Sequence, residues 1–505
     1  MSVHLRVASG FSLRYGACSP DALVGRAAEV GCDLLALTDR DGVYGAVRFA
    51  LACAEAGISP VLGVDLATAE VLPGALRGAP TDRSATVPSR SPAHGGQWRD
   101  RHHPRAVLLA RDQRGWASLC RAVSAAHGER GEPLLALDTL DPQGIVVLLG
   151  HDSEVGRELA RNRPDRALRA IAPWRERCDV RIAVTSHRAR NGSLTTPLAA
   201  RMLGWADEQG IGAVYSHAVR YATPEQARMV DVLDAIRRLV PLDSRHLDRA
   251  NSGGYLIDPA AMACIVEEIV RAAGGSPARV RRLLRDTVDL AGSCALDPRR
   301  DLGIGEIHVP EAEILLGRSG HEAARVLRHR CEAGIHARYP AWEHDAALSR
   351  LDAELAIVDD LGFATYFLTV GEVVDLARRS GIRVAARGSG AGSVINFALG
   401  ISGVDPMRYG LLMERFLSPL RRALPDIDID VESARRTEVY DLIFDRFGAE
   451  RTACVSMMET YRARHAIRDV GAALGMPRGE IDTFAKAIPH IRARDLRTAL
   501  GDLPE

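Results

Sequence analysis

The chain has 505 residues, and at about 150 residues per domain this length predicts two to four domains with ample core. Basic and acidic side chains balance at 65 each, so whole-chain charge favours neither a nucleic acid nor an anionic membrane as a partner. No apolar run approaches the roughly 18 residues of a membrane span, and the N-terminus has no signal-peptide core. We therefore expect a soluble, cytoplasmic protein without a membrane partner.

Residue usage excludes several kinds of site. The nine cysteines include no C-x-x-C pair, which fits neither a disulfide framework nor a zinc ribbon. Lys486 is the only lysine. A Walker A loop and a protein kinase both need a lysine for phosphates, so neither exists upstream of that position.

The first part of the chain alternates strand-like apolar runs with helical stretches, as in β/α units around a parallel sheet or barrel. Ser19 and Pro20 have the residue types of a helix cap and a first helical position. The pattern predicts strands at 4–8, 33–38, 61–65, 106–110, 145–149, 181–184 and 212–215, and a helix at 43–56. The stretch 74–104 is rich in Pro, Ser, Gly, Arg and His, which predicts a surface insertion. We expect a first domain over 1–225 and a mainly helical connector over 226–360.

An acidic strand is predicted near residue 428, where apolar and acidic residues alternate strictly. A strand would place four carboxylates on one face, those of Asp426, Asp428, Asp430 and Glu432. Like charges so close together are unfavourable unless a cation lies among them, and Mg²⁺ is the usual oxygen-seeking partner. The pattern therefore predicts a magnesium site, with a solvated acidic strand face as the alternative.

A glycine-rich turn lies about forty residues upstream, between a predicted strand at 382–386 and a helical stretch that ends near Gly400. Its backbone N–H groups, with the positive end of the helix behind them, could accept phosphate oxygens. Gly388 and Ser389 would then hold a triphosphate, whereas a simple packing turn is the alternative. Residues 376–422 contain eight arginines against two acidic residues. A cationic pocket beside metal-binding carboxylates is what nucleotidyl transfer requires.

Several ordered motifs now resemble one family, the bacterial C-family DNA polymerases, which include the alpha subunits of DNA polymerase III. The motifs are GFATYFL at 362–368, RGSGAGS at 387–393, LLMERFL at 411–417, PDIDID at 425–430 and TYRARHAIRDVG at 460–471. The resemblance implies a nucleotidyltransferase-like α/β palm over 361–458 and the start of a helical thumb over 459–505. Tyr461-Arg462-Ala463-Arg464-His465, within the last of these motifs, and Thr38-Asp39-Arg40 are similar to the error-prone, damage-tolerant branch.

The family's site residues carry over onto matching positions of this chain. The resemblance implies that Asp426 and Asp428 are catalytic carboxylates that bind Mg²⁺, and that Arg415 contacts the incoming deoxynucleoside triphosphate. It also implies that Arg387, Gly388 and Ser389 form the triphosphate-binding turn. Arg464 and Arg468, four residues apart, could face the backbone of primer-template DNA from one helix, with a solvated helix face as the alternative. Other replication or repair proteins are expected partners.

The opening 225 residues resemble the polymerase and histidinol phosphatase (PHP) domain, whose active members bind a metal cluster at the mouth of a barrel. Several expected ligands are replaced here by residues that cannot bind a cation in the same way: Arg6, Ala8, Arg40, Asp65, Ala218 and Arg220. A guanidinium group carries a fixed positive charge and cannot ligate a metal. We therefore expect a PHP-like barrel with a structural role.

The fold class expected is thus a multidomain α/β protein, with a PHP-like β/α barrel, a helical connector, a palm and the start of a thumb. In this family a third catalytic carboxylate follows the thumb, beyond residue 505, so the isolated chain is expected to have little polymerase activity. Two alternatives stay open: a non-catalytic module that binds DNA or partner proteins, and a PHP-type phosphoesterase.

Overall fold

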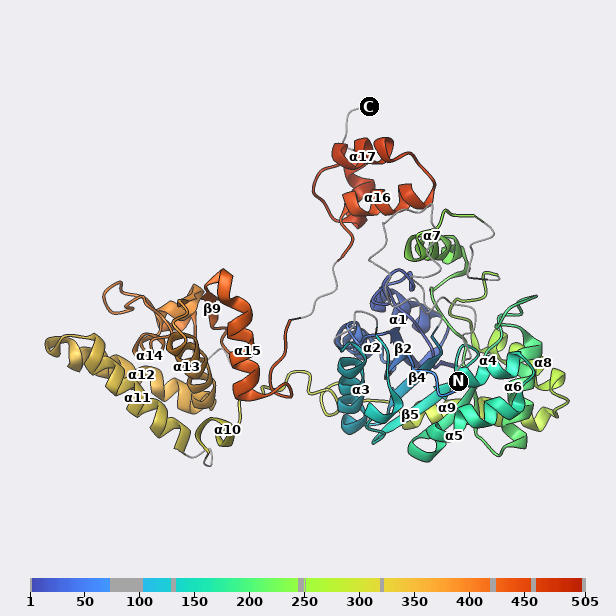
Figure 1. The fold of residues 1–505 in the computed structure, drawn as a ribbon, viewed down its shortest axis with the longest axis horizontal. Helices are drawn as coiled ribbons and strands as arrows, with labels where there is room; N and C mark the ends of the chain where they lie inside the picture. The colour runs from blue at the N-terminus through green and yellow to red at the C-terminus, as the bar shows by residue number, and fades with distance from the viewer. Residues whose placement is uncertain are drawn as a thin grey trace. The chain divides into compact units, whose positions relative to one another are not determined.

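The protein is described by a computed structural model covering residues 2–72, 103–128, 133–243, 249, 251–317, 322–417, 424–455 and 460–501. The predicted insertion at 74–104 lies outside these residues except for its last two positions. The chain forms two compact units (Figure 1), one of residues 1–304 with 457–505 and the other of residues 305–456. The boundary at residue 304 falls inside the expected helical connector.

A seven-stranded sheet forms the centre of the first unit, with its strands in sequence order. The strands are β1 (Ser2–His4), β2 (Cys32–Arg40), β3 (Ser59–Ala67), β4 (Arg105–Ala110), β5 (Ile145–Leu149), β6 (Asp179–Val184) and β7 (Ala213–Tyr215). All neighbouring strands are parallel except at β4, which runs antiparallel to both β3 and β5. The expected parallel arrangement is therefore wrong at this strand. Antiparallel neighbours need no helical crossover between them.

The two ends of the sheet meet beyond the strands. Val7, just after β1, forms a parallel bridge with Val219, just after β7. The Ala8 amide donates to the Val219 carbonyl at 3.0 Å, and the Val219 amide donates to the Arg6 carbonyl at 2.9 Å. The sheet therefore curls into a barrel-like form, with Leu5 and Val7 fully buried.

Among the described residues before 305, the barrel unit has nine α-helices. They are α1 (Pro20–Glu29), α2 (Ala46–Ala56), α3 (Gln113–Ala126), α4 (Glu154–Ala160), α5 (Pro164–Arg177), α6 (Thr196–Glu208), α7 (Ala227–Arg238), α8 (Pro259–Ala272) and α9 (Pro277–Ser293). The Ser19 side chain accepts a hydrogen bond from the Ala22 amide and Pro20 is the first residue of α1, as predicted from their residue types. Helices α2, α3, α6 and α9 pack on β3, β4, β6 and β7, so the helices cover the strands (Figure 1).

Three short C-terminal helices belong to the barrel unit. They are α16 (Ala463–Ala473), α17 (Arg478–Ala487) and α18 (Leu496–Gly501). Helix α16 packs against α7, and the Leu242 amide donates to the Ala473 carbonyl at 2.7 Å. Arg14 donates to the hydroxyl of Tyr461 at 2.9 Å and to the carboxylate of Asp469 at 3.0 Å. These contacts fix the C-terminal segment on the barrel.

The second unit is mainly helical and contains one two-stranded sheet. Its helices are α10 (Ala312–Leu316), α11 (Ala323–Arg338), α12 (His344–Leu361), α13 (Ala364–Arg379), α14 (Val394–Ala398) and α15 (Arg436–Phe447), and its strands are β8 (Val384–Arg387) and β9 (Asp428–Val431). Leu327, Leu351 and Phe367 form the centre of its core. A smaller cluster joins Ala377 of α13 and Val439 of α15 to the inner face of the sheet.

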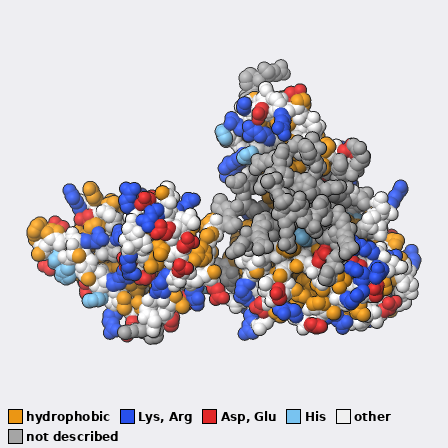
Figure 2. Space-filling model, in the orientation of Figure 1, with side chains coloured by type: hydrophobic (Ala, Val, Ile, Leu, Met, Phe, Trp, Pro, Cys, Tyr) orange, Lys and Arg blue, Asp and Glu red, His pale blue; other side chains and the backbone are white. Residues whose placement is uncertain are grey.

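The charged side chains on the surface are mixed in sign, as expected from the equal numbers of basic and acidic residues. Basic side chains are interspersed with acidic ones over the face visible in Figure 2. Among the described helices, none combines the length and the hydropathy that crossing a bilayer requires.

Candidate functional site

Strands β8 and β9 bring the glycine turn and the acidic strand together. They pair antiparallel, with Arg387 opposite Asp428. Gly388 follows directly with a φ of +75°, in the left-handed region that favours glycine. A Cβ atom at Gly388 would lie 3.9 Å from Oδ2 of Asp428. Two motifs forty residues apart in sequence are therefore neighbours in space.

The outer face of this sheet is charged. Asp428 and Asp430 alternate with Ile429 and Val431, whose side chains pack on the core. Asp430 lies opposite Ala385, and Arg387 reaches its carboxylate at 3.1 Å and that of Asp428 at 3.9 Å. The two aspartates therefore share a face with Arg387, which already supplies positive charge to them.

The acidic strand is shorter than predicted. Four carboxylates were expected on one strand face, but β9 covers only Asp428–Val431. Asp426 precedes the strand and is exposed, whereas Glu432 follows it. The glycine turn ends β8 after Arg387, so the partner strand supports pairing over four residues only.

Tyr366 was not singled out as a site residue by sequence reasoning, although it lies within the motif at 362–368. Its hydroxyl accepts a hydrogen bond from the Ile427 amide at 3.2 Å. Burial raises the pKa of Tyr366, and the charges of Asp426 and Asp428 raise it further, although the bond from Ile427 lowers it. Tyr366 therefore lies beside the two aspartates and fixes the backbone between them.

The turn at 388–392 is a short 3₁₀ helix with two different faces. Gly388 and Ser389 are exposed, whereas Gly390 and Gly392 are buried. A Cβ atom at Gly392 would come within 2.7 Å of the Leu412 carbonyl oxygen, so only glycine allows this close approach. The exposed half of the turn is free to contact a ligand.

The positive end of helix α14 is not available to a phosphate, contrary to our expectation. The amides of Val394 and Ile395 donate to the carboxylate of Glu354 at 3.1 and 3.3 Å. Glu354 is almost fully buried, and nothing in the local sequence links it to a turn forty residues away. A phosphate could therefore contact the turn itself but not the N–H groups of the helix behind it.

Arg415 belongs to a segment packed on the turn. It lies in a short 3₁₀ helix, Met413–Arg415, whose Met413 is buried, as is the following Phe416. A Cβ atom at Gly390 would lie 3.8 Å from the Phe416 ring. The Arg415 side chain is exposed. This packing holds the segment that carries Arg415 against the glycine turn.

The donor set fits magnesium bound together with a substrate. Mg²⁺ is usually held by one or two carboxylates plus substrate phosphates and waters, and Asp426 and Asp428 offer two carboxylates open to solvent. No cluster of three or more His, Cys, Asp or Glu side chains suited to a metal occurs among the described residues. Phosphate oxygens would have to complete the coordination.

Arg464 and Arg468, the predicted DNA contacts, lie on α16 in the barrel unit. Arg464 donates to the Ile488 carbonyl at 2.9 Å and lies 3.0 Å from Nε2 of His490. Arg468 is 3.5 Å from the carboxylate of Asp482. Both arginines therefore also brace α16 against the segment that contains α17.

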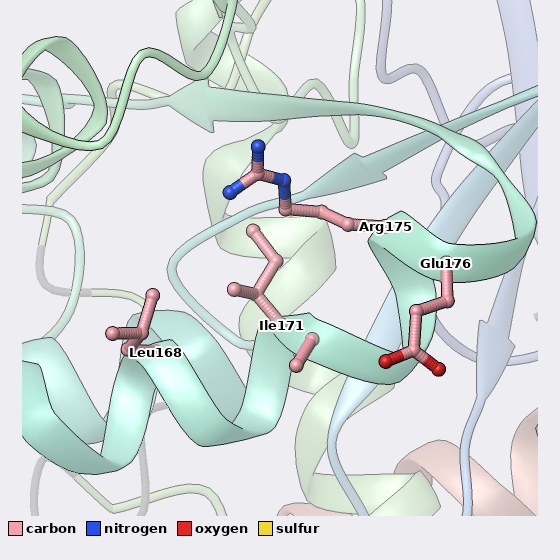
Figure 3. A pocket seen from close by; sticks show the side chains of 5 residues that line it. Leu168, Ile171, Arg175 and Glu176 are labelled. Carbon is pink, nitrogen blue, oxygen red and sulfur yellow. The ribbon is translucent and has the colours of Figure 1, made fainter.

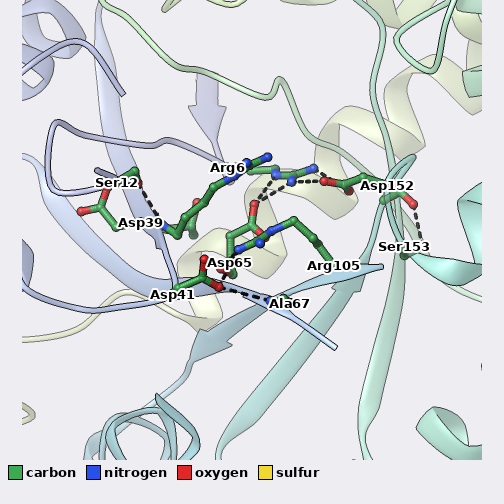
Figure 4. Close-up of polar contacts among 12 residues, drawn as sticks. Arg6, Ser12, Asp39, Asp41, Asp65, Ala67, Arg105, Asp152 and Ser153 are labelled. Atoms are coloured by element: carbon green, nitrogen blue, oxygen red, sulfur yellow. Dashed lines mark hydrogen bonds and ion pairs between the residues drawn. The ribbon is translucent and has the colours of Figure 1, made fainter. Parts of the chain in front are cut away.

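The barrel mouth contains guanidinium groups where the resemblance implied metal ligands (Figure 4). Arg6 donates to Asp65 at 2.6 Å and to Asp152 at 2.9 Å. Arg105 donates to the same Asp65 at 2.6 Å and to Asp41 at 2.8 Å. Asp41, Asp65 and Asp152 are thus neutralised by arginine, and the residues present do not fit a metal cluster.

Other mouth positions are also occupied by internal contacts. Arg220 pairs with the buried Asp234, and both Arg220 and Arg40 stack on the ring of Tyr15, with 3.9 and 3.4 Å from guanidinium carbon to ring centroid. His4 contacts the Ile257 carbonyl oxygen at 3.0 Å, and burial lowers its pKa to about 4. Each of these groups is thus held by contacts within the barrel.

A shallow depression on the outer helical layer of the barrel lies along α5 (Figure 3). It is lined by Leu168, Ile171, Ala172, Arg175 and Glu176. It contains no predicted site residue and no cluster of catalytic side chains, so we do not assign it a function.

Two family models match separate regions of the chain. Residues 4–184 match the PHP domain, and residues 325–504 match the family described as bacterial DNA polymerase III alpha NTPase domain. Among solved structures, an amidohydrolase from Chromobacterium violaceum is 16% identical with a TM-score of 0.29, over 43% of this chain and 86% of that chain.

Curated relatives are similar over nearly the whole chain. An error-prone DNA polymerase from Nocardia farcinica is 32% identical over 99% of this chain and 45% of its own length. Enzymes of the same name from Mycolicibacterium paratuberculosis and Symbiobacterium thermophilum are each 33% identical, over 96% and 100% of this chain and 41% and 44% of their own lengths. The chain thus spans less than half the length of these relatives. One region of it matches the PHP domain, another matches the DNA polymerase III alpha family, and the chain as a whole is similar to the N-terminal half of the error-prone DNA polymerases.

Proposed function

We propose that this chain is the N-terminal part of a template-directed DNA polymerase, and that its β8–β9 site binds magnesium and a deoxynucleoside triphosphate. One observation carries the proposal: Asp428 lies directly across the sheet from Arg387, with Gly388 beside it. Carboxylates for a metal and a turn for phosphates are adjacent, which is the arrangement that nucleotidyl transfer needs.

Each group of the site has a distinct task in this proposal. Asp426 and Asp428 hold Mg²⁺ and leave coordination positions open for phosphate oxygens. Gly388 and Ser389, which are exposed residues, bind the triphosphate through their backbone N–H groups. Arg387 and Arg415 supply positive charge to the phosphates. When bound, the metal lowers the barrier by activating the primer hydroxyl and by neutralising the charge of the leaving pyrophosphate.

The C-terminal helices and the barrel have supporting roles. We propose that α16 approaches primer-template DNA with Arg464 and Arg468 on one face. The barrel holds this segment through Arg14 and α7. Its arginine-filled mouth gives no support to a metal-dependent phosphoesterase. Damage-tolerant synthesis, as the names of the relatives suggest, and association with other replication or repair proteins are part of the same proposal.

Nucleotide binding by the purified chain tests the proposal. We expect dGTP to bind only in the presence of Mg²⁺, measured by isothermal titration calorimetry. D426N and D428N each replace a charged ligand with a neutral amide, which holds Mg²⁺ less strongly than a carboxylate, and should weaken binding at least about tenfold. D441N, which changes an exposed aspartate of α15, is the matched control and should leave affinity unchanged.

The same measurements distinguish the alternative of a non-catalytic module. Salt-dependent binding of primer-template DNA, together with no magnesium-dependent binding of dGTP, would overturn the proposed nucleotide site and support that alternative. Equal losses of affinity in D441N and D428N would also contradict the assignment, because the effect would then come from net charge alone.

A further inference from the structure

Glu354 connects helix α12 to the glycine turn. Its side chain is 1% exposed and accepts four hydrogen bonds. One oxygen accepts from Ser393 Oγ at 2.9 Å and the Ile395 amide at 3.3 Å. The other accepts from the Val394 amide at 3.1 Å and from Nε of Arg350 at 2.8 Å. A single buried carboxylate therefore holds the backbone where the turn becomes α14.

Arg350 extends this connection to a second segment. It lies one helical turn before Glu354, and its side chain is about a quarter exposed. Its Nη2 group lies 3.5 Å from the Gly392 carbonyl oxygen and 3.4 Å from the Leu411 carbonyl oxygen. The two carbonyls belong to segments that are almost twenty residues apart in sequence and in close contact at Gly392.

The charges of the pair suit a site for an anion. A bare carboxylate behind the turn would repel phosphate, but the guanidinium of Arg350 neutralises it. The positively polarised end of α14 is satisfied internally, so it does not draw a phosphate away from the exposed turn. The pair therefore adds no net charge to the site, and its contribution is to hold the turn in position.

We propose that Glu354 and Arg350 are positioning residues for the nucleotide site. Gly392 is four residues from Gly388, and Leu411 is four residues from Arg415, so the pair fixes the spacing between the two groups that contact the triphosphate. The identity of the ligand rests on the proposed function. The coupling of the two segments does not, since it follows from the contacts described above.

Amide hydrogen exchange in the full chain tests the coupling directly. E354Q keeps the size of the side chain but turns one acceptor oxygen into an amide group that cannot accept. We expect the Val394 and Ile395 amides to exchange on the order of tenfold faster, and exchange across 411–416 to rise because Arg350 loses its partner. R350M should mainly loosen 411–416. D352N changes an exposed aspartate of the same helix, and exchange in both segments should match the unmodified chain.

Binding of dGTP with Mg²⁺ supplies the functional measurement. E354Q and R350M should each weaken binding about fivefold or more at a temperature where the protein is folded, whereas D352N should stay within twofold. R350K, which keeps the charge but lacks the planar fork, should give an intermediate affinity. A purely structural role would lower the melting temperature and leave the affinity of the folded protein unchanged.

The two kinds of failure are distinguishable. If the unmodified chain does not bind dGTP, the proposed function fails, and the exchange data alone decide whether the two segments are coupled. If the chain binds dGTP but E354Q and R350M exchange and bind normally, the positioning role is wrong. If E354Q does not fold, R350M tests the positioning role instead. The Arg350 side chain lies at the edge of the core, and its loss leaves the bonds between Glu354 and the first amides of α14 in place.

Discussion

Substitution of Arg6 is the most direct test of the conclusion that arginine stabilises the carboxylates at the barrel mouth. The Arg6 guanidinium lies between two carboxylates whose side chains are 3% and 20% exposed, those of Asp65 and Asp152. R6M replaces it with an uncharged side chain of similar length. Asp65 retains Arg105 at 2.6 Å, whereas the described residues offer Asp152 no other arginine within ion-pair distance. The substitution therefore leaves one buried carboxylate almost uncompensated.

The size of the effect follows from the burial of the pair. Removing one partner of a buried ion pair destabilises a protein by about 3–5 kcal/mol. Because Asp65 stays paired and Asp152 is partly exposed, we expect about 3 kcal/mol. For a unit of roughly 350 residues this corresponds to a fall in melting temperature of about 4 °C. R6M/D152N removes both charges and should recover a large part of the loss.

The pH dependence of this loss gives a second, independent measure. Burial raises the pKa of Asp152, but the charge of Arg6 opposes it and the pKa lies well below its usual range. R6M removes that charge, so we expect the pKa of Asp152 to rise above its value in the unfolded chain. Such a group contributes stability at low pH and loses it as the pH rises through its folded pKa. R6M should therefore be more destabilised at pH 8 than at pH 5.

Urea unfolding followed by tryptophan fluorescence is a suitable assay. The buried Trp174 and Trp205 report on the barrel, whereas Trp342, in the other unit, is 83% exposed and should change little on unfolding. R188M removes an exposed arginine paired with Glu268 and, as the control, should change the free energy of unfolding by less than about 1 kcal/mol. An R6M loss as small as the control, or one independent of pH, would refute the proposed role of Arg6.

Two further predictions concern titration and charge. Burial lowers the pKa of His4 and His151 to about 4 and that of His187 to about 3, against about 6.5 when unfolded. The unfolded chain therefore binds more protons than the folded chain between pH 6.5 and 4. As the pH is lowered through this range, the free energy of unfolding should fall by up to about 1.4 kcal/mol per pH unit for each histidine. A free energy of unfolding that stays constant in urea titrations at pH 7, 6 and 5 would contradict this. R387Q removes a cation 3.1 Å from Asp430. With less positive charge beside the carboxylates, Mg²⁺ should bind about threefold more tightly, and dGTP should bind more weakly because its phosphates lose a cationic partner. Calorimetry in which the two affinities change in the same direction would contradict the assignment of Arg387 to the phosphates.

Local patterns were sufficient to predict most of the barrel. The run of apolar residues at 145–149 is the whole of β5, and the residue types at Ser19 and Pro20 marked the start of α1. The first strand was placed too late, at 4–8, whereas β1 is Ser2–His4. Burial explains the error, because Leu5 and Val7 are as buried as strand residues, but beyond β1 this segment forms only an isolated bridge, between Val7 and Val219.

Long-range features could not be predicted in this way. Whether β4 runs parallel or antiparallel to β3 depends on the connection between them, and the hydrophobic periodicity of a strand does not indicate its direction. Alternation alone suggested a face of four carboxylates, but the length of β9 is set by β8, which ends at the glycine turn. Glu354 looked like any acidic residue on a helix. Its function depends on amides forty residues away, so only the fold shows it.

The arginines at the barrel mouth have a consequence for the cell. A metal cluster in their place would be subject to chelation and to shortage of zinc or manganese, and its ligands would have to lose protons before binding. Guanidinium groups are covalently part of the chain and keep their charge at every physiological pH. The integrity of this domain, and of the C-terminal helices packed on it, is thereby independent of the supply of either ion.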